Sequence, residues 1–238
     1  MKLRFYGSDG IVTETDKHSC FSVSSDDPNR EDFFLFDAGS PSIISNENVD
    51  ITSIFLTHPH LDHVKNIYTL LLFLENSGRK EDLDIFSPVN LRDHISKEIT
   101  TDVENNVNFR FKFKKEVPKK FNRLNLNYLE TEQKTCPPVP LYLYKISDKD
   151  MSIGYVTDTN LTPEIKDFFD GVDILITEAS VSFKNEHLGI HGLKELIKNT
   201  EPEKVILTHF SEPNPEKLKE EIEHHDVVCA SDGMKFKL

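Results

Sequence analysis

The sequence predicts an α/β fold on two observations. Residues 51–56 form a short run of β-branched and aromatic side chains, typical of a strand, and residues 63–76 follow with apolar side chains at helical spacing. Strand-like and helix-like segments alternate again in the second half, where a predicted helix at Pro163–Phe169 precedes a buried run at residues 172–177. The loop between strand and helix at residues 57–62 is where layered α/β folds build their sites.

The N-terminal half predicts strands separated by polar turns. Residues 2–6 alternate between polar and apolar side chains, and the unbroken apolar run at Phe33–Phe36 indicates a buried strand ending at Asp37. After the helix at residues 63–76, an amphipathic helix is predicted at residues 88–100. Further strands are predicted at residues 18–24, Leu83–Phe86 and 107–115.

The strand at residues 107–115 has one basic face, and Lys119, Lys120 and Arg123 follow it. One interpretation is a surface that receives a phosphate-bearing substrate. We favour the other, an edge strand protected from pairing by its lysines, because the rest of the chain is acidic.

The C-terminal half predicts a second sheet, which strands at residues 227–230 and 234–236 are expected to close. A charged terminal helix is expected at residues 215–225, with most of its surface in solvent. The other predicted elements are strands at 124–131, 141–146, 151–157 and Lys204–Thr208, and a helix at 192–199.

Neither a repeat nor a Gly/Ser linker divides the 238 residues, so we expect a single domain over residues 1–238. No apolar run approaches the roughly 20 residues that span a bilayer, and the N-terminus leads into a strand rather than a signal peptide. The three sparse cysteines fit a reducing, cytoplasmic location. The net charge of −13 repels polyanions, so extended nucleic-acid binding is not favoured.

Three histidines and an aspartate directly follow the strand at residues 51–56: His58, His60, Asp62 and His63. Imidazole nitrogens and carboxylate oxygens are ligands for zinc or manganese. His58 and His60 alternate in an extended segment and can converge on one ion, whereas Asp62 and His63 face another direction and can hold a second. The alternative is that four polar residues share a surface loop by coincidence and have no role in binding a metal. Chance clustering of these residue types is uncommon.

The pattern H-x-H-x-D-H at residues 58–63 resembles the metallo-β-lactamase superfamily. The resemblance implies a four-layer αβ/βα sandwich with metals at one edge of its two sheets. It also implies that Asp37 holds the metal loop by hydrogen bonds and that Asp158, in residues 154–159, bridges both metals. A carboxylate has two oxygens and can bridge where an imidazole cannot.

The superfamily usually places a third first-site histidine in the connection at residues 134–140, but this sequence has no histidine between His94 and His187. Cys136 is the soft ligand in that connection, and its thiolate would bind zinc well. The alternative interpretation of Cys136 is a small buried apolar residue. A site of three protein ligands completed by water is also chemically reasonable.

Residues 176–180 and 207–211 resemble the phosphodiesterase branch of the superfamily, which includes the tRNA 3′-end processing endonuclease and smaller cyclic phosphodiesterases. The resemblance implies His209 as a second-site ligand and a Glu178–His187 pair near the leaving group. A carboxylate orients and charges an imidazole, which then donates a proton. The remaining histidines match no part of the pattern and are expected at the surface: His18, His94, His191, His224 and His225.

Together these features predict a metal-dependent hydrolase, best matched to a phosphodiesterase that uses a metal-bridging hydroxide. Its cofactors are two divalent metal ions, with zinc the best match and manganese or iron the alternatives. The implied first-site ligands are His58, His60 and Asp158, with Cys136 as a further candidate. The implied second-site ligands are Asp62, His63, His209 and the shared Asp158. The implied catalytic residues are Asp62, Glu178 and His187.

The expected partner is a small phosphodiester or nucleotide substrate, and a homodimer is left open. Three alternatives remain. One is the tRNA 3′-processing endonuclease, although the sequence has no long Gly/Pro-rich insertion for a tRNA-grasping arm. Another is a thioester or lactam hydrolase of the same fold, and the last is a catalytically degenerate metal-binding protein.

Overall fold

The computed structural model describes residues 1–10, 16–25, 32–44, 50–94, 97–121, 123–135, 138–180, 187–210, 215–224 and 226–238. The chain divides into two compact units. The first unit comprises Met1–Gly7, Asp16–Val117 and Asp232–Leu238, and the second comprises Ser8–Thr15 and Pro118–Ser231. The single domain expected from the sequence stays a prediction.

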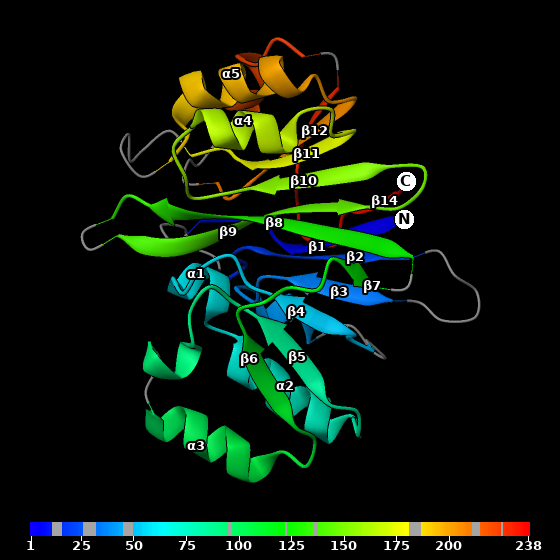
Figure 1. The fold of residues 1–238 in the computed structure, drawn as a ribbon, viewed down its shortest axis with the longest axis vertical. Coiled ribbons are helices and arrows are strands. Elements are labelled where there is room, and N and C mark those ends of the chain that lie inside the picture. Colours follow the sequence, from blue (N-terminus) through cyan, green and yellow to red (C-terminus); the bar gives the residue numbers. More distant parts are fainter. Residues whose placement is uncertain are drawn as a thin grey trace. The chain divides into compact units, whose positions relative to one another are not determined.

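The described part of the first unit builds a seven-stranded mixed sheet (Figure 1). Strands β3 to β6 run parallel to one another, whereas the pairings β14–β1, β1–β2 and β2–β3 are antiparallel. In spatial order the strands are β14 (Lys235–Lys237), β1 (Lys2–Gly7), β2 (Cys20–Ser24), β3 (Phe33–Phe36), β4 (Ser53–Phe55), β5 (Leu83–Phe86) and β6 (Phe111–Lys114).

The phenylalanines of the first unit form a ladder across four neighbouring strands. Phe21, Phe36, Phe55 and Phe86 are register partners, and their stacked rings lie 5.1–5.2 Å apart between centroids. Stacked aromatic pairs contribute about 0.5–1.5 kcal/mol each beyond the burial of their area. This ladder fixes the strand register, and therefore which side chains emerge at the strand ends.

Helices of the first unit bury an apolar face beside this sheet. The predicted helix at residues 63–76 is divided into α1 (Leu61–Val64) and α2 (Ile67–Asn76). In α2, buried leucines and Tyr68 contact the core, and α2 packs against α3 (Lys97–Asn106) through a 2.8 Å hydrogen bond between Tyr68 and Thr100 (Figure 1). Two short 3₁₀ turns are η1 (Pro41–Ile43) and η2 (Leu91–Asp93).

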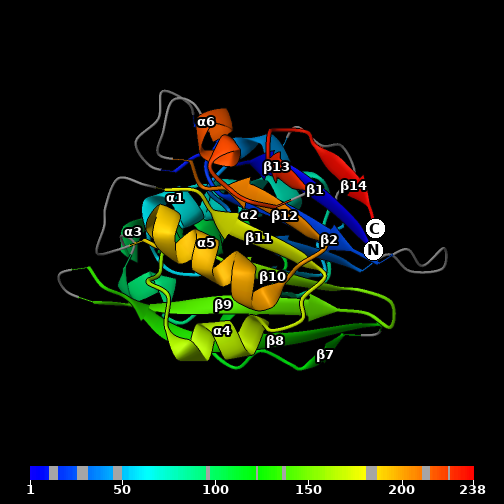
Figure 2. The ribbon, with the colours of Figure 1, turned by 90° about the horizontal axis from the view of Figure 1, so that it is seen from above.

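The described residues of the second unit build another seven-stranded mixed sheet. Helices α4 (Pro163–Phe169) and α5 (Gly189–Thr200) cover one of its faces (Figure 2), and α6 (Pro215–Glu220) precedes its last strand. In spatial order the strands are β13 (Val227–Cys229), β12 (Lys204–Thr208), β11 (Ile174–Glu178), β10 (Ser152–Val156), β9 (Val139–Ser147), β8 (Leu124–Gln133) and β7 (Lys120–Phe121).

Parallel strand pairing places the candidate site residues of each unit at the ends of neighbouring strands. In the second unit β10, β11 and β12 are parallel neighbours. In the first unit β3 and β4 are likewise parallel. The carboxyl ends of parallel strands meet at one edge of a sheet, so the residues that follow them are brought together.

Several expectations from the sequence are wrong in placement. The strand predicted to close the second sheet at residues 234–236 is β14, which instead pairs with β1, because Phe236 packs edge-on against Phe5. The helix predicted at residues 88–100 is displaced along the chain and is α3, which extends past residue 100 because its buried face continues to Val103.

The basic strand is shorter than predicted but is an edge strand, as we favoured. It begins at Phe111 as β6, the last strand of its sheet, and exposes Lys112 and Lys114. Among the other histidines, His94 and His191 are exposed as expected, while His225 lies outside the described residues. His18 is buried rather than at the surface, and His224 is half-buried beside the carbonyl oxygen of Pro202.

Candidate metal centre

In the first unit, Asp37 organises the histidine loop. It follows β3 with a left-handed φ of 56° and is fully buried. Its Oδ1 accepts hydrogen bonds from the Thr57 main-chain N–H at 2.8 Å and the Thr57 hydroxyl at 3.0 Å, and its Oδ2 lies 2.8 Å from His63 Nδ1. The predicted hydrogen bonding of the loop by Asp37 is therefore confirmed.

These bonds determine which ring nitrogens remain for a ligand. His63 directs Nδ1 at the Asp37 carboxylate, and His58 directs Nδ1 at the Thr57 hydroxyl at 3.1 Å. A carboxylate only accepts, so the His63 proton belongs on Nδ1. The Thr57 hydroxyl donates to Asp37 and accepts from His58. Both rings then present an unprotonated Nε2, the atom that coordinates a metal when a polar group holds the other nitrogen.

The predicted residues of this loop lie together. The His58 ring centroid lies 4.2 Å from that of His63 and 4.5 Å from that of His60. Asp62 Oδ2 lies 3.6 Å from His63 Nε2. His58, Asp62 and His63 are buried and His60 is half-buried, so the first unit gathers three imidazoles and a carboxylate in a largely dry loop.

The main chain of Asp37–Gly39 holds this loop from beneath. The Ala38 N–H donates to the His63 carbonyl oxygen at 2.6 Å, and the Asn66 side chain donates to the Gly39 carbonyl oxygen at 2.8 Å. A Cβ on Gly39 would lie 1.8 Å from the Asp62 carbonyl oxygen. Only glycine fits this close approach of two backbones.

In the second unit, Glu178 and His187 form a buried pair. Glu178 ends β11, and its Oε1 accepts from the main-chain N–H groups of Thr159 at 3.2 Å and Leu188 at 3.1 Å. Its Oε2 hydrogen-bonds His187 Nδ1. Two N–H donors and an imidazole satisfy the buried carboxylate. The predicted pairing is therefore present.

Asp158 and His209 complete this cluster. His209 Nε2 lies 3.4 Å from Asp158 Oδ2, and His187 Nδ1 lies 3.8 Å from Asp158 Oδ1. Ligand atoms of Asp158, His187 and His209 all lie within 4.8 Å of one another, close enough to surround one ion. Imidazole nitrogens beside a carboxylate suit zinc and other divalent transition metals, so the residues of this unit fit a metal ion.

Backbone strain accompanies these positions. Asp158 has a φ of 51° and His209 a φ of 54°, both in the left-handed region that non-glycine residues rarely adopt. The His209 turn is braced by Ser8, whose carbonyl oxygen accepts from the Phe210 N–H at 3.0 Å, and by Gly10, whose N–H donates to the Phe210 carbonyl oxygen at 2.7 Å. Strain of this kind persists only where surrounding contacts enforce it.

The structure thus brings the predicted residues together within each unit: His58, His60, Asp62 and His63 in the first, and Asp158, Glu178, His187 and His209 in the second. Cys136 lies outside the described residues, so its ligation stays a prediction. Sequence reasoning missed Thr57 and Gln133. The signal for Thr57 was a hydroxyl beside His58, and that for Gln133 was a polar residue directly before the connection that lacks a histidine.

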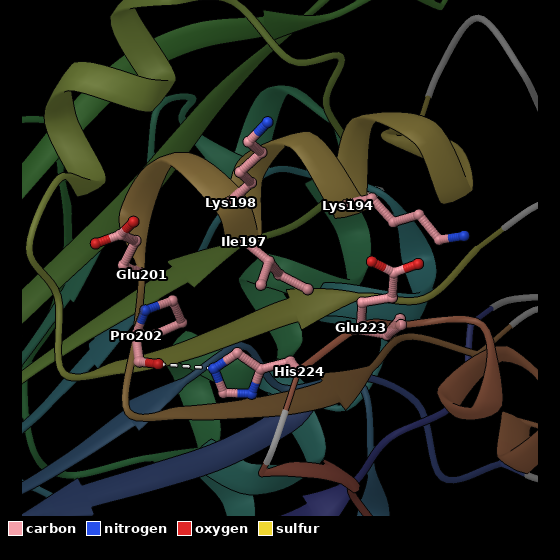
Figure 3. Close-up of a pocket in the computed structure, with 8 residues that line it drawn as sticks. Lys194, Ile197, Lys198, Glu201, Pro202, Glu223 and His224 are labelled. Carbon is pink, nitrogen blue, oxygen red and sulfur yellow. Dashed lines mark hydrogen bonds between the residues drawn. The ribbon is translucent and has the colours of Figure 1, made fainter.

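A separate hollow of about 480 Å³ lies in the second unit between α5 and residues 222–224 (Figure 3). Lys194, Ile197 and Lys198 line it from α5, and His224 Nε2 donates a hydrogen bond to the Pro202 carbonyl oxygen. It borders the start of β12, whereas His209 follows the other end of that strand, so this hollow is distinct from the cluster around Asp158.

Comparison with known families gives a match over most of the chain. The sequence model of the β-lactamase superfamily domain matches residues 34–210. A ribonuclease Z from Nitrosopumilus maritimus is 24% identical over an alignment that covers 100% of both chains.

No helix in the described part of the chain is long and apolar enough to cross a membrane.

Solved structures show the same fold. The metallo-β-lactamase fold protein YhfI from Bacillus subtilis superposes with a TM-score of 0.77, at 17% identity and 99% coverage of both chains. The short form of human tRNase Z superposes with a TM-score of 0.76, at 17% identity, covering 100% of this chain and 99% of that one. The predicted α/β metallo-β-lactamase fold is confirmed, and the chain belongs to the metallo-β-lactamase superfamily, as a hydrolase.

Proposed function

We propose that this protein is a phosphodiesterase that uses two divalent metal ions. The observation that carries the proposal is the repeated carboxylate–histidine pair. Asp37 holds His63 in the first unit, and Glu178 holds His187 in the second. Orienting partners of this kind support metal ligands and proton-transferring imidazoles.

The proposed ligands divide between two ions. The first ion would be held by His58, His60 and Asp158, with Cys136 as a further candidate. The second would be held by Asp62, His63, His209 and the shared Asp158. Zinc matches this donor set best, and manganese or iron also suit its carboxylates.

The chain's own residues then carry the proton transfers. When bound, two such ions lower the pKa of a shared water to about 7 and neutralise charge on the phosphoryl oxygens. Asp62, which lies beside His63 in the histidine loop, would orient that water. His187 donates its Nε2 proton to the departing oxygen, and Glu178 stabilises the imidazolium at Nδ1.

The favoured substrate is a small phosphodiester or nucleotide, because the net charge of −13 opposes a long polyanion. The match to ribonuclease Z along the whole chain favours a second candidate, an endonuclease acting on RNA. A cytoplasmic location and a homodimer stay predictions.

An activity panel with added zinc or manganese tests the proposal. It would comprise bis(p-nitrophenyl) phosphate, cyclic nucleotides, a tRNA precursor, a thioester and a lactam. We expect phosphodiester turnover that chelation removes, metal addition restores and His63→Ala abolishes in a folded protein. Precursor cleavage that falls steeply with salt would favour the endonuclease. Turnover of the thioester or lactam alone, or metal binding without any turnover, would contradict the proposal.

A further inference from the structure

Gln133 is a buried polar residue beside the carboxylate of Asp158, and the roles proposed above leave it unused. It is the last residue of β8 and pairs in register with Val139. Its side chain is only 2% exposed, and its Nε2 donates a hydrogen bond to Asp158 Oδ1 at 3.2 Å. The amide therefore reaches the same carboxylate that lies between His187 and His209.

The hydrogen bond fixes the orientation of the amide. An ionised carboxylate accepts only, so the NH₂ group of Gln133 donates to Asp158 Oδ1, and the carbonyl oxygen beside it needs a partner other than that carboxylate oxygen. That oxygen, Oε1, is buried, and it has no hydrogen-bond partner among the residues that the structure describes. A buried acceptor without a partner is unfavourable and calls for an ion, a water or a ligand.

We propose that Gln133 is a metal-site residue whose Oε1 coordinates the cation bound at Asp158. This inference rests on the proposed metal centre and adds a ligand to it. The connection after Gln133 contains no histidine, and an amide oxygen, like an imidazole, is a neutral donor. It is also a harder donor, so it shifts metal preference from zinc towards manganese or iron.

Substitution of Gln133 separates coordination from structural support. Gln133→Met keeps the length of the side chain without an oxygen donor, and it should weaken metal binding about 10- to 100-fold. Gln133→His supplies an imidazole, and it should raise the preference for Zn²⁺ over Mn²⁺ at least tenfold. Glu132→Met, an exposed change at the neighbouring position of β8, is the matched control and should leave both affinities unchanged.

The measurements use the full chain, stripped of metal and titrated with Zn²⁺, Mn²⁺ or Co²⁺ against a chromophoric chelator. The visible spectrum of bound Co²⁺ should change in Gln133→His, because a nitrogen replaces an oxygen in its coordination sphere. Thermal unfolding of the metal-free variants verifies that they fold.

The outcomes distinguish this inference from the proposed function. Unchanged metal selectivity and an unchanged Co²⁺ spectrum in Gln133→His would overturn the role of Gln133, even if wild type hydrolyses phosphodiesters. If the variants show the expected shifts but the wild-type protein binds metal and hydrolyses no phosphodiester, the result would support the metal-binding role of Gln133 and contradict the proposed function. A wild type that binds none of the three metals would overturn both.

Discussion

Asp37 Oδ2 lies 2.8 Å from His63 Nδ1, and both side chains are fully buried. The same relationship recurs in the second unit, where Glu178 holds His187 by its Nδ1. In each unit a carboxylate fixes the tautomer of an imidazole, so that Nε2 faces the proposed chemistry. The two pairs can be tested separately, because they are predicted to serve different steps.

Asp37→Asn should impair metal binding while preserving the fold. The asparagine oxygen can still accept from the Thr57 N–H, but its NH₂ group then faces His63 Nδ1 and moves the ring proton to Nε2. We expect metal affinity to fall about 10- to 100-fold and the free energy of unfolding to fall by about 1–3 kcal/mol. Chelator competition and urea unfolding measure these, with Asp50→Asn, at an exposed carboxylate, as the control. An affinity equal to that of wild type would contradict the assignment.

Glu178→Gln should impair proton donation rather than metal binding. The substituted amide cannot stabilise a charged His187, so turnover of a diester with an alkoxide leaving group should fall by about 100-fold or more. Turnover of a p-nitrophenyl ester should change little, because that leaving group departs without a proton. The control is Glu203→Gln, an exposed position. Lost metal affinity in Glu178→Gln would instead indicate that His187 is a ligand.

Gly39→Ala should destabilise the protein. The new Cβ would lie 1.8 Å from the Asp62 carbonyl oxygen, so the backbone of the histidine loop must move. We expect a loss of about 1–3 kcal/mol in the free energy of unfolding. Gly192 lies within α5, and a Cβ there would come no closer than 3.6 Å to its neighbours. We therefore expect Gly192→Ala to raise the free energy of unfolding by up to about 1 kcal/mol. Equal unfolding midpoints for the two variants would show that the close approach at Gly39 is absent in solution.

Alkaline pH should destabilise the fold. Burial, with smaller contributions from Glu130 and Tyr128, raises the pKa of Tyr142 to about 12, and burial also raises the pKa values of Tyr6 and Cys20. Above the ordinary tyrosine pKa of about 10, the unfolded chain therefore holds fewer protons than the folded one. Stability is complete below that pH and falls as pH rises through 10 towards 12. Urea unfolding between pH 8 and 11 should show a shallower decline in Tyr142→Phe, and an identical decline would contradict the shift.

The chemistry of the candidate centre was predictable because its residues directly follow strands. A short pattern such as residues 58–63 reports both its ligands and the strand before it, and Asp158 and His209 follow β10 and β12 in the same way. Within each sheet, the register of parallel strands then brings these ends together without any further signal in the sequence.

What could not be predicted depends on tertiary packing. The strand β14 has three residues and no pattern that assigns it to a sheet, so only its contact with β1 decides its partner. The placement of α3 depends on packing against α2, where Tyr68, distant in sequence, hydrogen-bonds Thr100. Gln133 is the one glutamine of the sequence, but a polar residue at a predicted strand end is ordinarily exposed, so only the fold shows that it is buried beside Asp158.

The positive φ angles of Asp37, Asp158 and His209 restrict which residues these positions tolerate. Aspartate and histidine are among the non-glycine types that adopt a left-handed backbone most readily, whereas β-branched residues rarely do. Replacement by asparagine would therefore keep the backbone of such a turn, while valine or isoleucine would force the turn to change whatever room surrounds the side chain.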